Sequence, residues 1–121
     1  MSDVEIAKLF DRWNSAVQSG DPKKVTKLYD EKAILLPTVS NKVRHNHPEI
    51  EEYFRHFLSK GPRGEIDESN VRFFGDLAIN SGLYIFTFEN GEIVKARFTF
   101  VYAYKDEGWR IVEHHSSAMP E

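Results

Sequence analysis

The first part of the chain repeats its apolar residues every three to four positions, which is the period of an amphipathic helix. Ser2, followed three positions later by Glu5, has the pattern of a capping box and predicts where the first helix begins. Ser19-Gly20 predicts where it ends. Between these signals the apolar face of the predicted helix consists of Ile6, Leu9, Phe10, Trp13, Ala16 and Val17.

Two more helices and a short strand are predicted before the pattern changes. Asp21-Pro22 supplies a cap and a first helical position, and the apolar face of this second helix is Val25, Leu28 and Tyr29. Residues 33–36 are an apolar run that predicts a brief buried strand, ended by Pro37. Residues 38–47 lack periodicity and predict a loop. Pro48 then opens a third helix, with an apolar face of Ile50, Tyr53, Phe54, Phe57 and Leu58.

From residue 65 onward the pattern predicts four strands joined by tight turns. The strands are expected at residues 65–74, 77–88, 93–104 and 109–117. The turns are expected at Gly75-Asp76, at Asn90-Gly91, which is a strong hairpin signal, and at Asp106-Glu107-Gly108. Three helices followed by an antiparallel meander predict an α+β fold in which the helices cover one face of a curved sheet. The length of 121 residues predicts one domain over residues 1–121.

The strand at 93–104 has two different faces. Val94, Ala96, Phe98, Phe100, Tyr102 and Tyr104 form the more apolar set, which we expect to face the helices. The opposite set is Ile93, Lys95, Arg97, Thr99, Val101 and Ala103. That mixed face is too apolar to be left wholly to water, so we expect a homodimer or a larger homo-oligomer that covers it. The alternative is a moderately apolar face exposed to solvent.

Composition excludes several classes of function. The formal net charge of −3 and the lack of a Lys/Arg stripe argue against nucleic-acid binding. No apolar run approaches a membrane span, and the N-terminus lacks the features of a signal peptide, so we expect a cytoplasmic protein without a membrane partner. With no cysteine, the chain offers no thiolate nucleophile and no cysteine metal ligand.

The last strand carries the candidate chemistry. It passes from Ile111 and Val112 into His114-His115-Ser116-Ser117, and Pro120 then ends the segment. Four hydrogen-bonding side chains on a strand that still looks core-bound suggest a polar site inside an apolar cavity. Strand alternation groups His114 and Ser116 with Arg110 and Val112, and groups His115 and Ser117 with Trp109 and Ile111. Only one pair can face the cavity, and the aliphatic residues do not decide which.

The element order, with Gly20-Asp21-Pro22, Trp109-Arg-Ile-Val112 and the terminal motif, resembles the nuclear-transport-factor-2-like superfamily. The chain looks most like the association (hub) domain of calcium/calmodulin-dependent protein kinase II. The resemblance implies a cone-shaped curved sheet with the three N-terminal helices on its concave face. An alignment with the hub domain, whose pocket arginine falls at the Ser116 position, favours His114 and Ser116 as the pair that faces the pocket.

A narrower resemblance is to the iota-class carbonic anhydrases, which end in His-His-Ser-Ser-x-Met-Pro on this fold. Here that ending is residues 114–120, and Leu36-Pro37-Thr38 and the helix that carries Tyr53 add to the match. The resemblance implies reversible hydration of CO2 to bicarbonate in an apolar pocket, without a cofactor and with no metal required. It implies catalytic roles for Thr38, Tyr53, His114 and Ser116, with Thr38, Tyr53, Ser116 and Phe100 contacting the substrate.

The chemistry of these residue types fits that reaction. CO2 carries no charge, so its site should be largely apolar, and Phe54, Phe86, Phe98 and Phe100 are candidate walls. Hydroxyl groups are donors for the charge that develops on the product oxygens. Histidine is the side chain whose ordinary pKa suits proton transfer near neutrality.

Other interpretations stay open. Tyr53 can be an amphipathic rim residue, Thr38 a turn residue, and the terminal motif a satisfied polar strand end. His45 and His47 have chelating spacing but lack further ligands, so two solvated histidines are the simpler expectation. Arg44 and Arg97 can bind an anion, with surface ion pairs as the alternative. At the level of function, the rivals are a non-catalytic hub module and a SnoaL-like isomerase, which would need a pocket carboxylate such as Glu113.

Overall fold

The protein, analysed as a computed structural model, is described at residues 3–38, 40–106 and 108–120. Helix α1 (Asp3–Gln18) comes first, followed by α2 (Pro22–Thr26), strand β1 (Tyr29–Leu36) and helix α3 (His47–Leu58). Strands β2 (Arg63–Phe74), β3 (Leu77–Thr87), β4 (Ile93–Lys105) and β5 (Gly108–Ala118) complete the chain. Ser2, the expected cap, and Glu107, in the middle of the expected third turn, lie outside the described residues.

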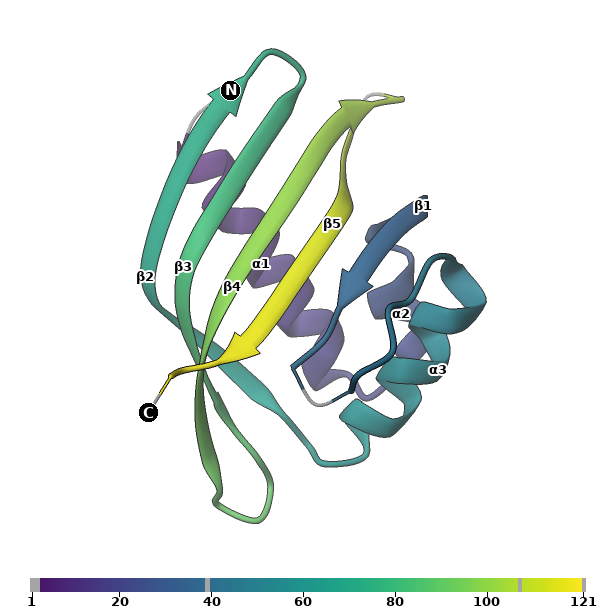
Figure 1. Ribbon diagram of the computed structural model, residues 1–121, viewed down its shortest axis with the longest axis vertical. Helices are drawn as coiled ribbons and strands as arrows, with labels where there is room; N and C mark the ends of the chain where they lie inside the picture. The colour runs from purple at the N-terminus through teal and green to yellow at the C-terminus, as the bar shows by residue number, and fades with distance from the viewer. Residues whose placement is uncertain (1–2, 39, 107, 121) are drawn as a thin grey trace.

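The strands form one sheet in the order β1-β5-β4-β3-β2 (Figure 1). Strands β2 to β5 pair antiparallel, as predicted. Strand β1 pairs parallel to β5, which places Leu35 beside His114. The α+β class and the curved sheet are confirmed. The first strand was expected to be short, but it begins four residues earlier than the apolar run and adds a parallel edge to the meander.

The predicted end of the second helix is wrong. Helix α2 ends at Thr26, and Tyr29 is already the first residue of β1. The Leu28 carbonyl accepts a hydrogen bond from the Ile111 backbone N–H at 2.9 Å. The backbone leaves the helix there because β5 offers it strand partners, a long-range effect that local periodicity does not contain.

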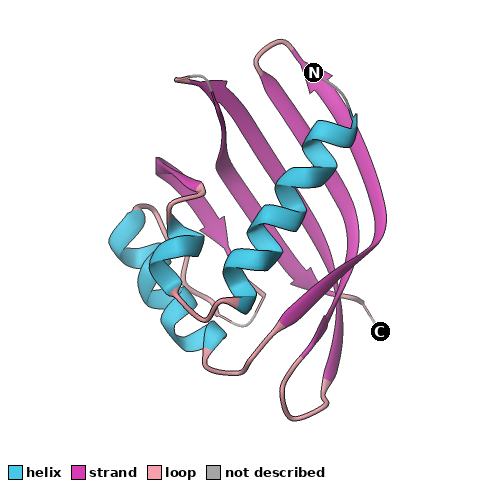
Figure 2. Ribbon diagram, turned by 180° about the vertical axis from the view of Figure 1, so that it is seen from behind, coloured by secondary structure: helices cyan, strands magenta, loops and turns pink. Residues whose placement is uncertain are grey.

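Helix α1 crosses the concave face of the sheet, and α2 and α3 lie beside it at the β1 end (Figure 2). Ile6, Phe10, Trp13 and Val17 of α1 are buried, which confirms the predicted apolar face. In β4 the predicted inward set is buried from Ala96 to Tyr102. Tyr104 is an exception at 39% exposure, because it lies close to the end of the strand.

The ends of helix α3 are fixed by local signals. The Asn46 side chain accepts a hydrogen bond from the Glu49 backbone N–H at 3.0 Å and thereby caps the first turn. Its buried face is the predicted one, with Tyr53, Phe54 and Phe57 turned toward the sheet. Within the described parts of the chain, no helix is long and apolar enough to cross a membrane.

Candidate functional site

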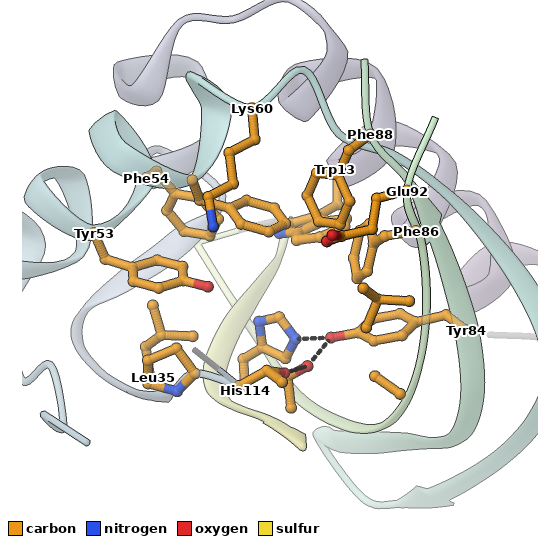
Figure 3. A pocket seen from close by; sticks show the side chains of 16 residues that line it. Trp13, Leu35, Tyr53, Phe54, Lys60, Tyr84, Phe86, Phe88, Glu92 and His114 are labelled. Atoms are coloured by element: carbon orange, nitrogen blue, oxygen red, sulfur yellow. Dashed lines mark hydrogen bonds between the residues drawn. The ribbon is translucent and has the colours of Figure 1, made fainter. Parts of the chain in front are cut away.

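A cavity lies between α3, the end of β1 and the inner face of the sheet (Figure 3). Water-sized molecules can occupy about 80 Å³ of it. Its walls are mostly aromatic and aliphatic, and include Trp13, Leu35, Phe54, Phe57 and Phe86. Thr38, Tyr53, His114 and Ser116 also line it, so four predicted site residues from three segments of the chain meet there.

A bulge in β5 decides which residues of the terminal motif face this cavity. Val101 pairs with Glu113, but the next residue, Tyr102, pairs with Ile111, so Val112 is the extra residue. The bulge resets the alternation, and Ile111 is buried on the same side as His114 and Ser116. Our grouping of Ile111 with His115 and Ser117 was therefore wrong. His115 is exposed and Ser117 half-buried, and neither lines the cavity.

His114 is the centre of a buried hydrogen-bond chain. Its Nδ1 lies 2.8 Å from the Tyr29 hydroxyl, which accepts a hydrogen bond from Trp13 Nε1 at 3.1 Å. Its Nε2 lies 3.2 Å from the Tyr84 hydroxyl, and that hydroxyl donates to Ser116 Oγ at 2.5 Å. Ser116 Oγ in turn lies 2.5 Å from Thr38 Oγ1. Four segments of the chain thus share one polar network.

Counting donors and acceptors shows which group donates at each step of this hydrogen-bond chain. The buried Tyr29 hydroxyl accepts from Trp13, and among the described residues His114 Nδ1 is the acceptor that remains for its hydrogen. His114 therefore carries its own hydrogen on Nε2 and donates it to Tyr84. Tyr84 donates to Ser116, Ser116 to Thr38, and the Thr38 hydrogen is left for the cavity. This network sets the tautomer of His114.

Burial keeps the groups of this network uncharged. It lowers the pKa of the His114 imidazole to about 3, with a smaller effect from nearby His115. It raises the pKa of the Tyr29 and Tyr84 phenols well above the usual tyrosine value. At neutral pH the imidazole is therefore neutral and both phenols keep their protons.

Tyr53 contributes a free hydroxyl. Its side chain extends from α3 with the hydroxyl pointing into the cavity (Figure 3), and the described residues provide no hydrogen-bond partner for it. Burial raises the pKa of Tyr53, an effect that the Arg44 cation, 5.3 Å from the ring centroid, opposes only in part. The phenol is thus a donor at neutral pH.

Phe100 does not occupy its predicted place. It is fully buried and does not line the cavity; its ring stacks on His114 with centroids 4.0 Å apart and an angle of 19° between the planes. Phe98 is likewise behind the wall, whereas Phe54 and Phe86 form part of it. Phe100 therefore packs behind the imidazole and cannot touch a molecule in the cavity.

Sequence reasoning missed three members of the network: Trp13, Tyr29 and Tyr84. Tyr84 had a usable signal, since it alternates with Phe86 on the inner face of β3 and a buried phenol usually has a partner. Tyr29 was assigned to a helix, which concealed its inward direction. Nothing local distinguishes Trp13 from any other core aromatic.

The charged lining residues lie at the edge of the cavity. Lys60 and Glu92 are exposed and line both the cavity and the neighbouring surface depression. Glu113 is exposed on the outer face of β5 and is not part of the cavity. Within the part of the chain that the structure describes, the cavity lining therefore provides no buried carboxylate.

His45 and His47 have separate partners. His45 Nδ1 pairs with Glu49 Oε1 at 3.1 Å, and His47 Nε2 donates to the Tyr29 carbonyl at 2.7 Å. Among the described residues, no group of three or more His, Cys, Asp or Glu side chains is arranged to hold a metal ion. The chelating spacing of these two histidines reflects a helix-capping contact and a strand contact.

The family model of the calcium/calmodulin dependent protein kinase II association domain matches residues 2–120. The chain belongs to this family. A solved structure from Xanthomonas campestris that carries the name of the same association domain is 50% identical, with a TM-score of 0.92. The match covers 97% of this chain and 87% of that one.

More distant structures share the fold of this association domain. A nuclear transport factor 2 (NTF2)-like protein from Salmonella enterica serovar Typhimurium is 21% identical, with a TM-score of 0.82, over 97% of this chain and 90% of that one. A protein from Streptomyces avermitilis, provisionally named a dehydratase of the NTF2-like family, is 14% identical, with a TM-score of 0.83, over 96% and 94%. No curated protein matches the chain.

Proposed function

We propose that the cavity hydrates CO2 to bicarbonate, as the iota-class carbonic anhydrases do. The observation that carries this proposal is the pair of unused hydroxyl donors, Thr38 and Tyr53, in an apolar cavity whose buried polar groups are uncharged and whose charged residues, Lys60 and Glu92, are exposed. A small neutral substrate enters such a cavity without displacing a counter-ion. The two donors then stabilise the negative charge that appears only as the product forms.

The reaction needs a water molecule held beside the CO2 carbon. In the proposed step, the water oxygen forms a bond to that carbon, and the electron pair of one C=O bond moves onto its oxygen. Thr38 and Tyr53 donate hydrogen bonds to the oxygens that gain charge, and the proton that the water loses leaves past Glu92 and Lys60 to solvent. Thr38 is held by its hydrogen bond to Ser116 and the Tyr53 side chain by burial, so both donors need little reorganisation during the reaction.

His114 has a different role from the one expected. Burial lowers its pKa to about 3 and both ring nitrogens are hydrogen-bonded, so the imidazole is a poor proton acceptor near neutrality, and we do not propose the acid–base role that an ordinary histidine pKa suggests. We assign His114 a positioning role: it orients Tyr84, which orients Ser116 and Thr38. Ser116 acts in the same way, by directing the Thr38 hydrogen into the cavity.

The dimensions of the cavity argue against the isomerase alternative. About 80 Å³ is well below the roughly 300–1,000 Å³ typical of pockets for larger organic ligands. The described lining residues also include no buried carboxylate, the base that such isomerases use. A non-catalytic hub role is supported by family membership and by the partly apolar outer face of the sheet, and neither observation concerns the cavity.

The test is a stopped-flow assay of CO2 hydration with a pH indicator, on protein treated with EDTA. Thr38→Val keeps the shape but removes the hydroxyl, and we expect kcat/KM to fall about 100-fold or more, as when an oxyanion donor is removed. Tyr53→Phe should have a similar effect, and Thr38→Ser should restore much of the activity. Thr99→Val, on the outer face of β4, is the matched control.

Each outcome bears on a different part of the proposal. Full activity in both Thr38→Val and Tyr53→Phe, or no activity in the wild type, would reject CO2 hydration by this cavity. Activity that EDTA abolishes and added metal restores would reject the metal-free version. Activity that persists in Ser116→Ala would show that Thr38 does not depend on Ser116 for its orientation.

A further inference from the structure

A second recess shares part of its lining with the cavity. It has a volume of about 280 Å³ and is lined by Ser40, Arg44, Tyr53, His56, Phe57 and Lys60. Tyr53, Phe57 and Lys60 line both spaces, so the recess adjoins the cavity. Among the described residues no acidic side chain lines this recess, whereas Arg44 and Lys60 are cations.

Arg44 is held firmly in this recess. Two backbone hydrogen bonds of 2.9 Å join it to Leu35 of β1. Its side chain lies over the Tyr53 ring, and only 8% of the residue is exposed. We had expected a surface ion pair as the simpler role for this arginine, but within the described residues it forms none.

The guanidinium group keeps three unused donors. Nη1 donates to Ser40 Oγ at 2.6 Å and to the Lys42 carbonyl at 2.5 Å, which uses both of its hydrogens. The described residues provide no partner for Nε or Nη2. Arg44 is only 8% exposed and pairs with no carboxylate among the described residues, so its unused donors indicate a site for an anion.

We propose that the recess binds a small carboxylate, or bicarbonate, with its two oxygens on the Nε and Nη2 edge of Arg44. The edge of a guanidinium matches the planar carboxylate group with two parallel hydrogen bonds, which a point-charge lysine cannot do. Lys60 supplies a second cation at the rim, and Tyr53 and Phe57 provide apolar contact for the carbon side of the ligand. This site is distinct from the proposed reaction cavity and does not require that the cavity hydrate CO2.

The test uses the wild-type protein labelled with ¹⁵N and titrated with sodium acetate at constant ionic strength. The arginine Nε–H resonances report each side chain separately. We expect a saturable shift of the Arg44 signal, while the signal of the exposed Arg97 on β4 shifts little. Sodium chloride in place of acetate should give no comparable saturation at Arg44.

Variants locate the contacts. Arg44→Lys keeps the positive charge but removes the two parallel donors of the guanidinium group. It should weaken acetate binding about tenfold or more, because a charge-assisted hydrogen bond is lost. Lys60→Met removes the rim cation from an exposed position, and should weaken binding severalfold without affecting the fold. Arg97→Met is the control with the same change in net charge, and should bind as the wild type does.

Specific results would overturn the site. Equal, non-saturating shifts of the Arg44 and Arg97 resonances would show that the salt screens charges and does not bind. Equal shifts of the Arg44 resonance with acetate and with chloride would show the same. Lys60→Met binding as tightly as wild type, together with a saturable shift elsewhere in the protein, would move the acetate to another place. A lower dissociation constant for inorganic phosphate than for acetate would contradict the proposal that the Arg44 edge selects a planar carboxylate group.

Discussion

The neighbours of His114 fix the orientation of its imidazole ring and also lower its pKa. A histidine at the end of a strand suggested proton transfer, because its ordinary pKa lies near neutrality. In the fold the ring lies against Phe100 and Trp13, and the Tyr29 and Tyr84 hydroxyls use both of its nitrogens. The imidazole thereby becomes a neutral connector between buried hydroxyls.

The lowered pKa of His114 predicts how stability depends on pH. In the unfolded chain the histidine takes up a proton near pH 6.5, whereas the folded pKa is about 3. Between these values the unfolded state binds more protons, so the stabilisation is complete above about pH 6.5 and is lost as the pH falls toward 3. We expect the free energy of unfolding to decrease by up to about 1.4 kcal/mol per pH unit below pH 6.

Urea denaturation between pH 7.5 and 5 measures this slope. The range stays above the pH at which Asp30 and Glu49, whose pKa values are lowered, take up protons. His114→Gln should remove the slope, and His115→Gln on the outer face should keep it. In the wild type the Nε2–H tautomer should persist in NMR spectra to pH 5. Protonation of His114 above pH 5 would contradict the prediction.

Two buried tyrosines provide a second prediction. Tyr84→Phe leaves the His114 Nε2–H without an acceptor and removes the donor to Ser116, so we expect a loss of about 1–3 kcal/mol in the free energy of unfolding. Tyr102 has a buried hydroxyl without a partner among the described residues. Tyr102→Phe should therefore be neutral or stabilising, since it removes an unsatisfied polar group.

Chemical denaturation of the two variants and the wild type measures this difference. Both substitutions remove one oxygen atom from a buried tyrosine, so the volume change is matched. If Tyr102→Phe cost as much as Tyr84→Phe, the hydrogen-bond chain would not be the source of the stabilisation.

At the scale of elements, the shape of the site depends on irregularities in otherwise regular strands. The periodicity of two predicted β2 to β5 and their turns, but Val112 is skipped in the β4–β5 pairing and Asp67 in the β2–β3 pairing. A bulge adds one residue without changing the local apolar pattern, so sequence alternation does not reveal it. For this reason the alternation of side chains along the strand could not tell whether His114 and Ser116 face the cavity, whereas the alignment with the hub domain could favour them.

Gly82 offers a prediction at this scale. A Cβ atom added there would collide with the backbone carbonyl of Glu68, which follows the bulge in the neighbouring strand. Because the obstacle is backbone and not a flexible side chain, Gly82→Ala should cost about 2 kcal/mol or more in the free energy of unfolding. At Gly108 an added Cβ would meet no described atom within 4 Å apart from its chain neighbours, so Gly108→Ala should change the free energy of unfolding by less than about 0.5 kcal/mol.

Thermal or urea unfolding of both glycine variants tests the close approach of β2 and β3. Equal stabilities of Gly82→Ala and Gly108→Ala would mean that the two strands separate there at little cost.

At the scale of the whole molecule, the helices cover only one face of the sheet (Figure 2). On the opposite face Val101 and Ile79 are cross-strand partners, and both are half-buried in the isolated chain. The family is that of an association domain, and we predict that this outer face is where copies of the chain meet.

The assembly prediction is tested by light scattering coupled to size-exclusion chromatography. We expect the wild type to elute as a homodimer or larger assembly, and Val101→Lys to shift it toward the monomer, because a charge in the contact would lose its water. Val4→Lys introduces the same change at an exposed position of α1 and should leave the assembly intact. A monomeric wild type, or an unaffected Val101→Lys, would contradict this interface.

The sequence by itself determined the kinds of elements, most of their ends, the hairpin turns and the inward face of β4, because these follow from local periodicity and turn residues. The family resemblance, and not the residue pattern alone, pointed to Thr38, Tyr53, His114 and Ser116, which line one cavity. Only the tertiary structure decided the parallel pairing of β1, the bulge at Val112 and the chain of hydrogen bonds that links Trp13 to Thr38. The physical reason is distance along the chain: Tyr29 and His114 are 85 residues apart, and Thr38 and Ser116 are 78. Contacts at such separations depend on how the layers pack, and packing also sets the burial that keeps His114 neutral and encloses Arg44.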